Sequence, residues 1–308
     1  MNSSRDRDDA PTTSWRVVLA FAIVYIVWGS TYLAIRFAVE SIPPLLMAGT
    51  RFLVAGGLLY AWWAVKAGRS SVSATRAQLK SAFITALFLI SASYGLVSWA
   101  ELTVPSGIVA LVTAMTPLWM VVIPSFARGA RRPSALVFAG VALGLVAQAL
   151  LFGVGSIDRT RTDPWGLSAV VLASICWAIG SLRARRADLP NDAVLSSAMQ
   201  MLTGGALLVI AALLVGEVTR FSIGSMTVRS LLAWAYLVVA GSVIAYSAYI
   251  YLLKVTSPAR ASTNAYVNPI VAIVLGWLLA GEPIGWRTVI AMVLTLLAVL
   301  AINRGSRG

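Results

Sequence analysis

The fold of this chain is decided by stretches such as Leu231–Leu253, which reads LLAWAYLVVAGSVIAYSAYIYLL. This stretch contains no charged residue and no strand-like alternation of apolar and polar residues. A bilayer core of about 30 Å needs about 20 helical residues at about 1.5 Å per residue. Because lipid offers no partners for backbone groups, a segment of this kind spans the membrane as a helix.

Nine further apolar stretches of this kind occur in the 308 residues, separated by short polar breaks. They are Val17–Ala34, Leu45–Val65, Ala82–Ala100, Ile108–Ala127, Ala135–Val154, Trp165–Leu182, Ala193–Val215, Ala261–Ala280 and Ile284–Ile302. The sequence therefore predicts an all-α membrane protein with ten transmembrane helices.

The composition agrees with this prediction. Hydrophobic residues make up 59% of the chain and charged residues 11%, and the mean hydropathy is +0.85. A soluble domain carries about 25% charged residues. The net charge of +13 would suit a nucleic-acid-binding protein, but the basic residues lie in the connections between apolar stretches. We interpret them as the loops of a membrane protein, whose partner is the lipid bilayer and not a nucleic acid.

The distribution of Lys and Arg predicts the orientation. If the amino terminus is cytoplasmic, 17 of these residues face the cytoplasm, 6 face the other side, and Arg51 lies within a span. Because cytoplasmic loops carry the excess of positive charge, we expect both termini in the cytoplasm. Residues Met1–Ser14 are polar and of mixed charge, and we expect them to form a disordered cytoplasmic tail.

The two halves of the chain repeat one another. The matching positions are Tyr94 and Tyr246, Pro117 and Pro269, and Gly129 and Gly281, all 152 residues apart, together with Gly56-Gly57 and Gly204-Gly205, and Trp28-Gly29-Ser30 and Trp177 to Ser181. Since each repeat has five spans, an odd number, the second copy enters the membrane from the opposite side. We expect two inverted five-helix repeats, which are typical of secondary transporters because they give inward-open and outward-open states of similar free energy.

Several motifs carry a family resemblance. They are Trp28-Gly29-Ser30-Thr31-Tyr32, Pro43-Pro44, Arg51-Phe52, Pro105-Ser106, Thr116-Pro117, Trp177-Ala178, Gly241-Ser242, Tyr266-Val267-Asn268-Pro269 and Gly281-Glu282-Pro283. In these motifs the chain resembles the EamA-type family of the drug/metabolite transporter superfamily, whose members have ten helices in two repeats. The resemblance runs from Trp15 to Asn303 and implies repeats at 15–155 and 160–303.

The resemblance also implies a function. It is strongest to the drug/metabolite exporters, and so implies a secondary transporter that exports small metabolites or drug-like compounds across the cytoplasmic (inner) membrane. One departure is Ala130, where such families often place a Glu after the glycine that follows the fourth span. Glu282 keeps that position in the second repeat, so the first repeat lacks the corresponding loop interaction.

A substrate cavity is expected where polar and aromatic side chains lie deep in the spans. The candidates are Trp28, Ser30, Thr31, Tyr94, Thr113, Thr116, Trp177, Tyr246, Asn264, Tyr266 and Asn268. Pro117 and Pro269 are predicted to break or kink their helices, and corresponding interruptions in two halves are the best sequence indication of a central site. The alternatives are that the prolines only shape packing and that the aromatic residues form interfacial belts.

Arg51 is the basic residue that lies well inside a span. It either extends outward to pair with Glu40 or Glu101, which we favour slightly, or contacts an anionic group of the substrate from the cavity wall. The chain has no histidine, and its eleven carboxylates fall in tails, loops or span ends. A proton relay is therefore not evident unless Glu101 or Glu282 titrates at the entrance to the cavity.

The other functional classes fit less well. An enzyme would need a nucleophile, an acid–base pair or a metal set inside the spans, and we expect no catalytic residue, metal or cofactor. A channel would show rings of charge or a filter loop. A channel or a non-transporting scaffold remains the alternative to a carrier, and the sequence leaves the substrate, the energy coupling and the oligomeric state open.

Overall fold

The computed structural model describes residues 15–67, 74–126, 134–152, 163–184, 186–256 and 264–305. Every regular element within these ranges is a helix. The elements are α1 (Trp15–Ala38), α2 (Pro44–Ala67), α3 (Arg76–Ala86), η2 (Leu87–Ala92), α4 (Ser93–Ala100), α5 (Ser106–Thr113), α6 (Thr116–Ser125), α7 (Ala135–Phe152), α8 (Pro164–Ala184), α9 (Ala193–Leu214), α10 (Glu217–Arg220), η3 (Ile223–Ser225), α11 (Val228–Tyr236), η4 (Leu237–Ile244), α12 (Ala245–Val255), α14 (Asn264–Ala280) and α15 (Trp286–Gly305). The predicted tail Met1–Ser14 and the Gly129-Ala130 pair lie outside the described residues.

Seven helical segments of the described chain are long and apolar enough to cross a membrane. They are Trp15–Ala38, Pro44–Lys66, Arg76–Ala100, Ser106–Ser125, Pro164–Ala184, Ala193–Leu214 and Val228–Tyr249. Three shorter apolar segments, Ala135–Gly144, Val267–Ala280 and Trp286–Ile302, coincide with the fifth, ninth and tenth predicted spans. The all-helical prediction is confirmed, whereas the number of ten crossings stays a prediction.

Side-chain caps fix the starts of several helices. Thr75 begins α3 with a capping box, in which its side chain accepts from Gln78 N and the Gln78 side chain accepts from Thr75 N. The Asp192 carboxylate begins α9 by accepting from the first backbone N–H groups, at 2.8 Å and 3.0 Å. Such caps satisfy donors that the helix itself leaves unpaired, and so place the helix ends.

The two predicted interruptions differ from one another. The fourth apolar stretch is broken into α5 and α6 at Ala114 and Met115, and Pro117 stands in the first turn of α6, where a missing N–H costs nothing. Pro269, by contrast, lies inside α14, which continues through it. Pro269 therefore does not end its helix, and the predicted kink stays a prediction.

The third and eighth stretches each contain a π-helical segment in the middle. These segments are η2, between α3 and α4, and η4, between α11 and α12. Each lies shortly before one of the two matched tyrosines, Tyr94 and Tyr246. The two halves thus share a local irregularity at equivalent places.

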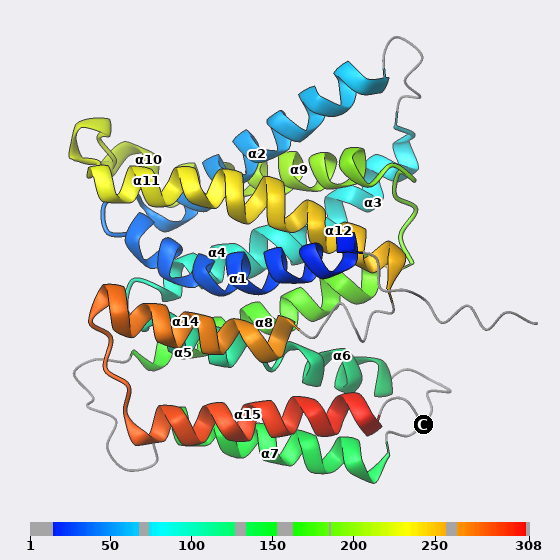
Figure 1. Ribbon diagram of the computed structural model, residues 1–308. Coiled ribbons are helices and arrows are strands. Elements are labelled where there is room, and N and C mark those ends of the chain that lie inside the picture. The colour runs from blue at the N-terminus through cyan, green and yellow to red at the C-terminus, as the bar shows by residue number, and fades with distance from the viewer. Residues whose placement is uncertain are drawn as a thin grey trace, which may run out of the picture.

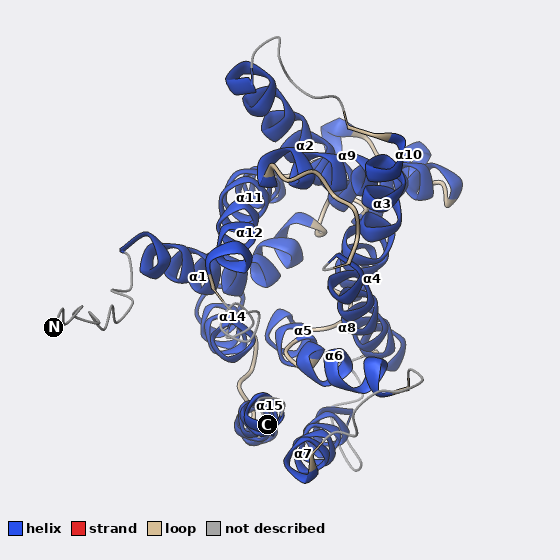
Figure 2. Cartoon of the chain, turned by 90° about the vertical axis from the view of Figure 1, so that its right-hand side faces the viewer, coloured by secondary structure: helices blue, strands red, loops and turns tan. Residues whose placement is uncertain are grey.

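The most extensive helix contacts are those of α2 with α9 and of α7 with α15. Figure 1 shows both pairs, with α7 and α15 together at one edge of the bundle. Figure 2 looks along the helices, with α1, α14, α5, α8 and α4 around the middle. The start of α1 and the end of α15 lie at the same end of the bundle (Figure 1), as an even number of crossings requires. We call this end the terminal end and the opposite one the far end.

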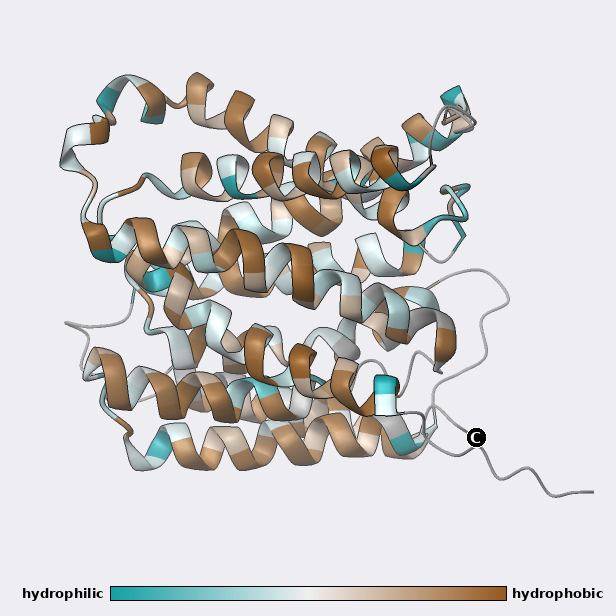
Figure 3. Ribbon diagram, turned by 45° about the horizontal axis from the view of Figure 1, so that its top comes forward, coloured by the Kyte–Doolittle hydropathy of each residue, from teal (hydrophilic) through white to brown (hydrophobic). Residues whose placement is uncertain are grey.

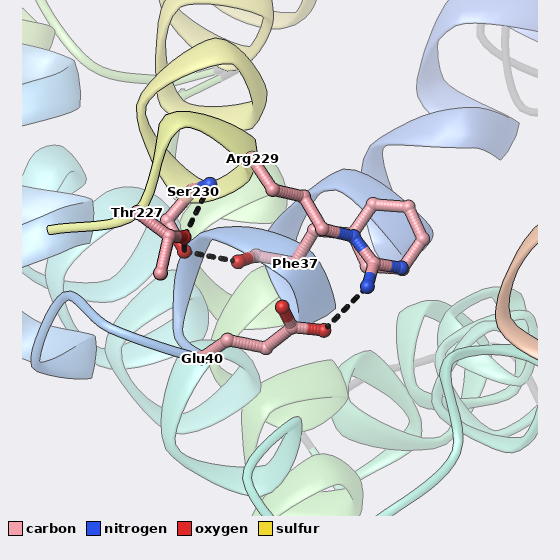
Figure 4. Close-up of polar contacts among 5 residues, drawn as sticks. All are labelled: Phe37, Glu40, Thr227, Arg229 and Ser230. Atoms are coloured by element: carbon pink, nitrogen blue, oxygen red, sulfur yellow. Dashed lines mark hydrogen bonds and ion pairs between the residues drawn. The ribbon is translucent and has the colours of Figure 1, made fainter.

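At the far end a small polar network joins the end of α1 to the start of α11 (Figure 4). The Ser230 hydroxyl donates to Phe37 O at 2.8 Å. The Arg229 guanidinium lies 3.6 Å from the Phe37 ring centre and pairs with Glu40 at 3.5 Å. Because both partners are half exposed, the ion pair itself contributes little, and the buried hydroxyl bond does more to hold the two helices together.

The surface of the bundle is apolar. Figure 3 shows brown, hydrophobic residues along most of the helices, with the hydrophilic ones mainly at helix ends. Large side chains such as Trp62, Phe138 and Trp277 are more than half exposed. Contiguous exposed apolar surface of this extent belongs in lipid.

Candidate functional site

A central cavity lies between α1, α4, α5, α6, α8, α12 and α14. It holds about 890 Å³ of empty space, its open mouth included. Its lining residues are Trp28, Thr31, Tyr32, Ile35, Ser93, Tyr94, Val97, Ala110, Thr113, Ala114, Thr116, Met120, Ser174, Trp177, Tyr249, Asn264, Asn268 and Pro269. The mixture of apolar walls with a few polar groups is that of a small-molecule site.

One wall of the cavity is a cluster of aromatic rings. Trp28 lies at the centre, 6.2 Å from Trp177 in an edge-to-face arrangement and 4.8 Å from Tyr249. Tyr94 continues the cluster, 5.6 Å from Trp177. The indole N–H of Trp28 donates to Gly241 O at 3.1 Å, which fixes the ring in the wall.

Hydroxyl and amide groups form another part of the lining. Tyr32 on α1 and Thr113 on α5 share a hydrogen bond of 2.8 Å across the cavity wall. The Thr116 hydroxyl donates to Thr113 O at 2.6 Å, where α5 gives way to α6. The Asn268 amide on α14 is placed to donate to the backbone oxygens of Tyr25 and Asn264, each at 3.2 Å. These groups join α1, α5 and α14 at the cavity, and they can exchange their bonds for bonds to a solute.

Arg51 lies directly behind the aromatic wall and is 1% exposed. Its Nε donates to Ser242 Oγ at 2.8 Å, and its guanidinium stacks over Phe52 at 4.8 Å and Tyr94 at 5.2 Å. Within the described part of the chain no carboxylate pairs with it. The slightly favoured expectation of an outward pair with Glu40 or Glu101 is thus wrong, since stacking on aromatic faces holds the guanidinium inside the bundle.

The structure brings together most of the predicted cavity residues. Those that line the cavity are Trp28, Thr31, Tyr94, Thr113, Thr116, Trp177, Asn264, Asn268 and Pro269. Their role in binding a solute stays a prediction.

Two predicted residues lie elsewhere. Ser30 faces away from the cavity and shares a hydrogen bond of 2.6 Å with the Tyr236 hydroxyl. Tyr246 is 2% exposed and donates to Gln200 Oε1 at 3.5 Å. The side chains of Pro117 and Tyr266 lie outside the part of the structure that is described.

The sequence reasoning missed several lining residues, among them Tyr32, Ser174 and Tyr249. Tyr32 could have been found, because Trp28, Thr31, Tyr32 and Ile35 follow the spacing of one helix face. Tyr249 stands three residues after Tyr246 on α12, and the sequence alone gives no signal for which of the two faces the cavity. No group of three or more metal-ligating side chains occurs among the described residues.

The chain is similar to a known family along nearly its whole length. The model of the EamA-like transporter family matches it twice, at residues 15–153 and 164–304. The "Uncharacterized inner membrane transporter YedA" of Escherichia coli (strain K12) is 38% identical over 288 residues, which are 93% of this chain and 90% of that protein. The "Uncharacterized transporter YoaV" of Bacillus subtilis (strain 168) is 22% identical over 274 residues, 87% of this chain and 90% of the relative.

One solved crystal structure has a similar fold. It superposes with a TM-score of 0.66 at 18% sequence identity and covers 96% of this chain and 100% of its own. At this identity the likeness concerns the fold alone.

Proposed function

The chain belongs to the EamA-like transporter family, and from this premise we propose that it exports small metabolites or drug-like compounds across the inner membrane by alternating access. The family and the relatives named as transporters favour a non-enzymatic membrane transporter. The observation that carries the proposal is the central cavity, whose lining combines a cluster of aromatic rings with hydroxyl and amide groups. We propose that the predicted residues among its lining bind the solute.

The proposal includes ten spans in two inverted repeats, 15–155 and 160–303, with both termini in the cytoplasm. The helix contacts support it, because the most extensive of them are preserved when each helix is exchanged for its counterpart. α2 packs on α9, and α7 packs on α15, so each pair joins two counterparts. α1 packs on α14 and α12, while α8 packs on α5, α6 and α4, which is the same set of contacts with the halves exchanged.

The proposal also assigns Arg51 a part in binding. Its guanidinium touches the back of Tyr94, which lines the cavity, and among the described residues it has no carboxylate partner. A buried cation of this kind favours a negative group nearby. An anionic part of the solute can reach it if the Tyr94 ring turns aside.

The test has two steps. Comparative metabolomics of cells with and without the gene identifies the solute that accumulates inside cells lacking the protein. The purified protein in liposomes should then move this solute with saturable kinetics and counterflow. Linear, unsaturable flux would favour a channel, and no flux of any solute in the metabolite pool would favour a scaffold.

A further inference from the structure

Glu101 is the carboxyl group whose burial the proposed function leaves unexplained. It follows α4 directly, outside the candidate span Arg76–Ala100, and it is 0% exposed. Neither of its carboxylate oxygens has a hydrogen-bond partner within the described structure. Val97, one helical turn earlier, lines the cavity. Glu101 therefore lies at the far end of the cavity, one turn beyond its lining.

Residues near Glu101 at the far end belong to a buried apolar cluster. Ala38, Val39, Ala100, Val104 and Val109 belong to one buried apolar cluster and are each at most 7% exposed. These residues come from the end of α1 and the residue after it, from the end of α4 and the turn after it, and from α5. By the predicted orientation this is the outer end, and a solute leaving the cavity outward has to part this cluster.

Charged groups of two neighbouring elements interact with Glu101, and a further acid lies close to Thr103, two residues later. On α1, the Arg36 guanidinium donates to the backbone oxygen of Glu101, and Tyr32 lies one turn before it. On the connection between α14 and α15, the Glu282 carboxylate interacts with Glu101 electrostatically. At the start of α8, Asp163 accepts from Thr103 Oγ1 at 3.5 Å.

The two neighbouring acids have donors that Glu101 lacks. Glu282 accepts from Ser106 N at 2.9 Å, from Ser106 Oγ at 2.8 Å and from Gly107 N at 3.2 Å, and so caps α5. Asp163 accepts from Trp165 N and Gly166 N at the start of α8. Helix N-termini stabilise both of these charges. The Arg36 bond goes to the backbone of Glu101, so the carboxyl itself receives no donor.

A carboxyl in this position favours its neutral form. Burial raises the pKa of Glu101 well above its usual range, the nearby Glu282 charge raises it further, and Arg36 lowers it. The neutral form avoids an uncompensated buried charge, whereas the ionised form requires water or a direct bond to Arg36. Water can reach the carboxylate, or Arg36 can bond to it directly, only when the packed far end opens.

We propose that Glu101 is a proton-binding site, and that the bound proton holds the outer end of the cavity closed. The site rests on the proposed function, since it gives the transporter a coupling ion. When the outer end is open, the Glu101 carboxylate takes a proton from water and becomes a neutral carboxyl, which can be buried as the cluster closes. Because the closed state binds the proton more tightly, raising the pH shifts the protein toward the outward-open state.

The test measures the opening of the outer end without any solute. The single native cysteine is replaced (Cys176→Ser), and Val104→Cys places a thiol in the closed cluster. A membrane-impermeant maleimide labels this thiol in proteoliposomes at a series of pH values. The exposed position Ser225→Cys, also at the far end, serves as reference, so that dividing the two rates removes the intrinsic pH dependence of thiol reactivity.

With wild-type Glu101, the normalised labelling should rise by up to about tenfold per pH unit between the Glu101 pKa of the open state and that of the closed state, and should level off outside this range. Glu101→Gln should give low labelling at every pH, because the neutral amide mimics the protonated carboxyl. Glu217→Gln is the matched control. Glu217 is an acid at the same end that caps α2 through Leu45 N and Leu46 N, and its loss should leave the pH response in place.

The proposal is overturned if labelling does not depend on pH, or if Glu101→Gln keeps the wild-type response. Should Glu101→Gln fail to fold, Glu101→Asp replaces it. If the pH midpoint of labelling is then the same as in the wild type, the result counts against the proposal. Failure here is separate from failure of the proposed function. Saturable counterflow in liposomes together with pH-independent labelling would leave a transporter without a proton site at Glu101. A pH response without transport would reject the proposed transport function and keep the proton-binding site at Glu101.

Discussion

At the scale of single residues, the aromatic wall makes a direct prediction about Trp28. Replacing Trp28 with Ala removes its ring contacts with Trp177 and Tyr249 and its hydrogen bond to Gly241. A solute that packs on the Trp28 ring loses a contact of about 0.5–1.5 kcal/mol, and about 1.4 kcal/mol corresponds to a tenfold change in affinity. We expect the apparent affinity for the exported solute to fall by up to about tenfold, measured as the concentration dependence of counterflow.

The matched control is Tyr246→Phe. Tyr246 was predicted from the sequence to line the cavity, but its hydroxyl is buried away from it against Gln200. This substitution should leave the affinity for the solute within about twofold, because it removes one long hydrogen bond outside the site. Equal losses in the two variants would mean that the cavity described here is not where the solute binds.

These residues also show how far the sequence reaches. Depth in a span and a polar or aromatic side chain were enough to select Trp28, Tyr94 and Asn268, which line the cavity. The same rule selected Ser30 and Tyr246, which do not. The direction in which a residue faces depends on how its helix is rotated against its neighbours, and an apolar stretch carries little information about that rotation.

At the scale of elements, the contact between α2 and α9 depends on glycine. A Cβ atom on Gly205 would lie 2.7 Å from Leu53 N and 2.9 Å from Gly49 O, both of them backbone atoms that cannot move aside cheaply. Gly57, its counterpart in the repeat, has no atom within 4 Å of such a Cβ. Close approach of helix backbones through small residues is the usual way in which membrane helices pack.

We therefore expect opposite effects from the same substitution. Gly205→Ala should lower the thermal unfolding midpoint of the purified protein in detergent by several degrees, since overpacking costs about 1–3 kcal/mol. Gly57→Ala should leave the midpoint unchanged or raise it, because Ala is the better helix former by about 1 kcal/mol. Similar midpoints for the two variants would contradict the tight α2–α9 contact.

Elements were predicted from the sequence with unequal success. Long apolar stretches predicted the helices correctly, because a backbone that lies in lipid has to be helical. The break between α5 and α6 follows from Pro117. The segments η2 and η4 contain no proline and have no local signal. In η2, Ser91 donates both to Ala86 O at 3.3 Å and to Gly204 O on α9 at 3.1 Å, so a neighbouring helix takes part in satisfying the irregular turn. A contact of this kind exists only in the folded bundle.

At the scale of the whole molecule, the family resemblance read from the sequence motifs is confirmed by the double match to the EamA-like transporter family. The motifs could reveal the family because they lie where helices must break, cap or approach closely. Glu282 is an example, since its carboxylate caps α5 by accepting from Ser106 N at 2.9 Å and from Gly107 N at 3.2 Å. The relative motion of the halves, however, is a property of the assembled bundle and needs a test of its own.

The proposed alternating access can be tested by locking α5 to α14 at the far end. A Cβ atom on Gly107 lies 3.6 Å from Ile273 Cβ, within the range of about 3.5–4.5 Å found in disulfides. The change Ile273→Cys also removes the Cγ1 atom that would otherwise crowd the new side chain. In a Cys176→Ser background, oxidised Gly107→Cys/Ile273→Cys protein should lose counterflow because the outer end cannot part, and reduction should restore it.

The control pair is Gly144→Cys/Ala298→Cys, which joins α7 to α15 with the same separation of 3.6 Å. The new side chain at 144 also meets the end of the Met115 side chain, which is flexible enough to move aside. Because α7 and α15 contribute no residue to the cavity lining, their cross-link should leave counterflow intact. Mass spectrometry of the oxidised protein establishes that each bridge has formed. A fully bridged α5–α14 pair that still transports at the rate of the reduced protein would show that the solute leaves by a path other than the far end.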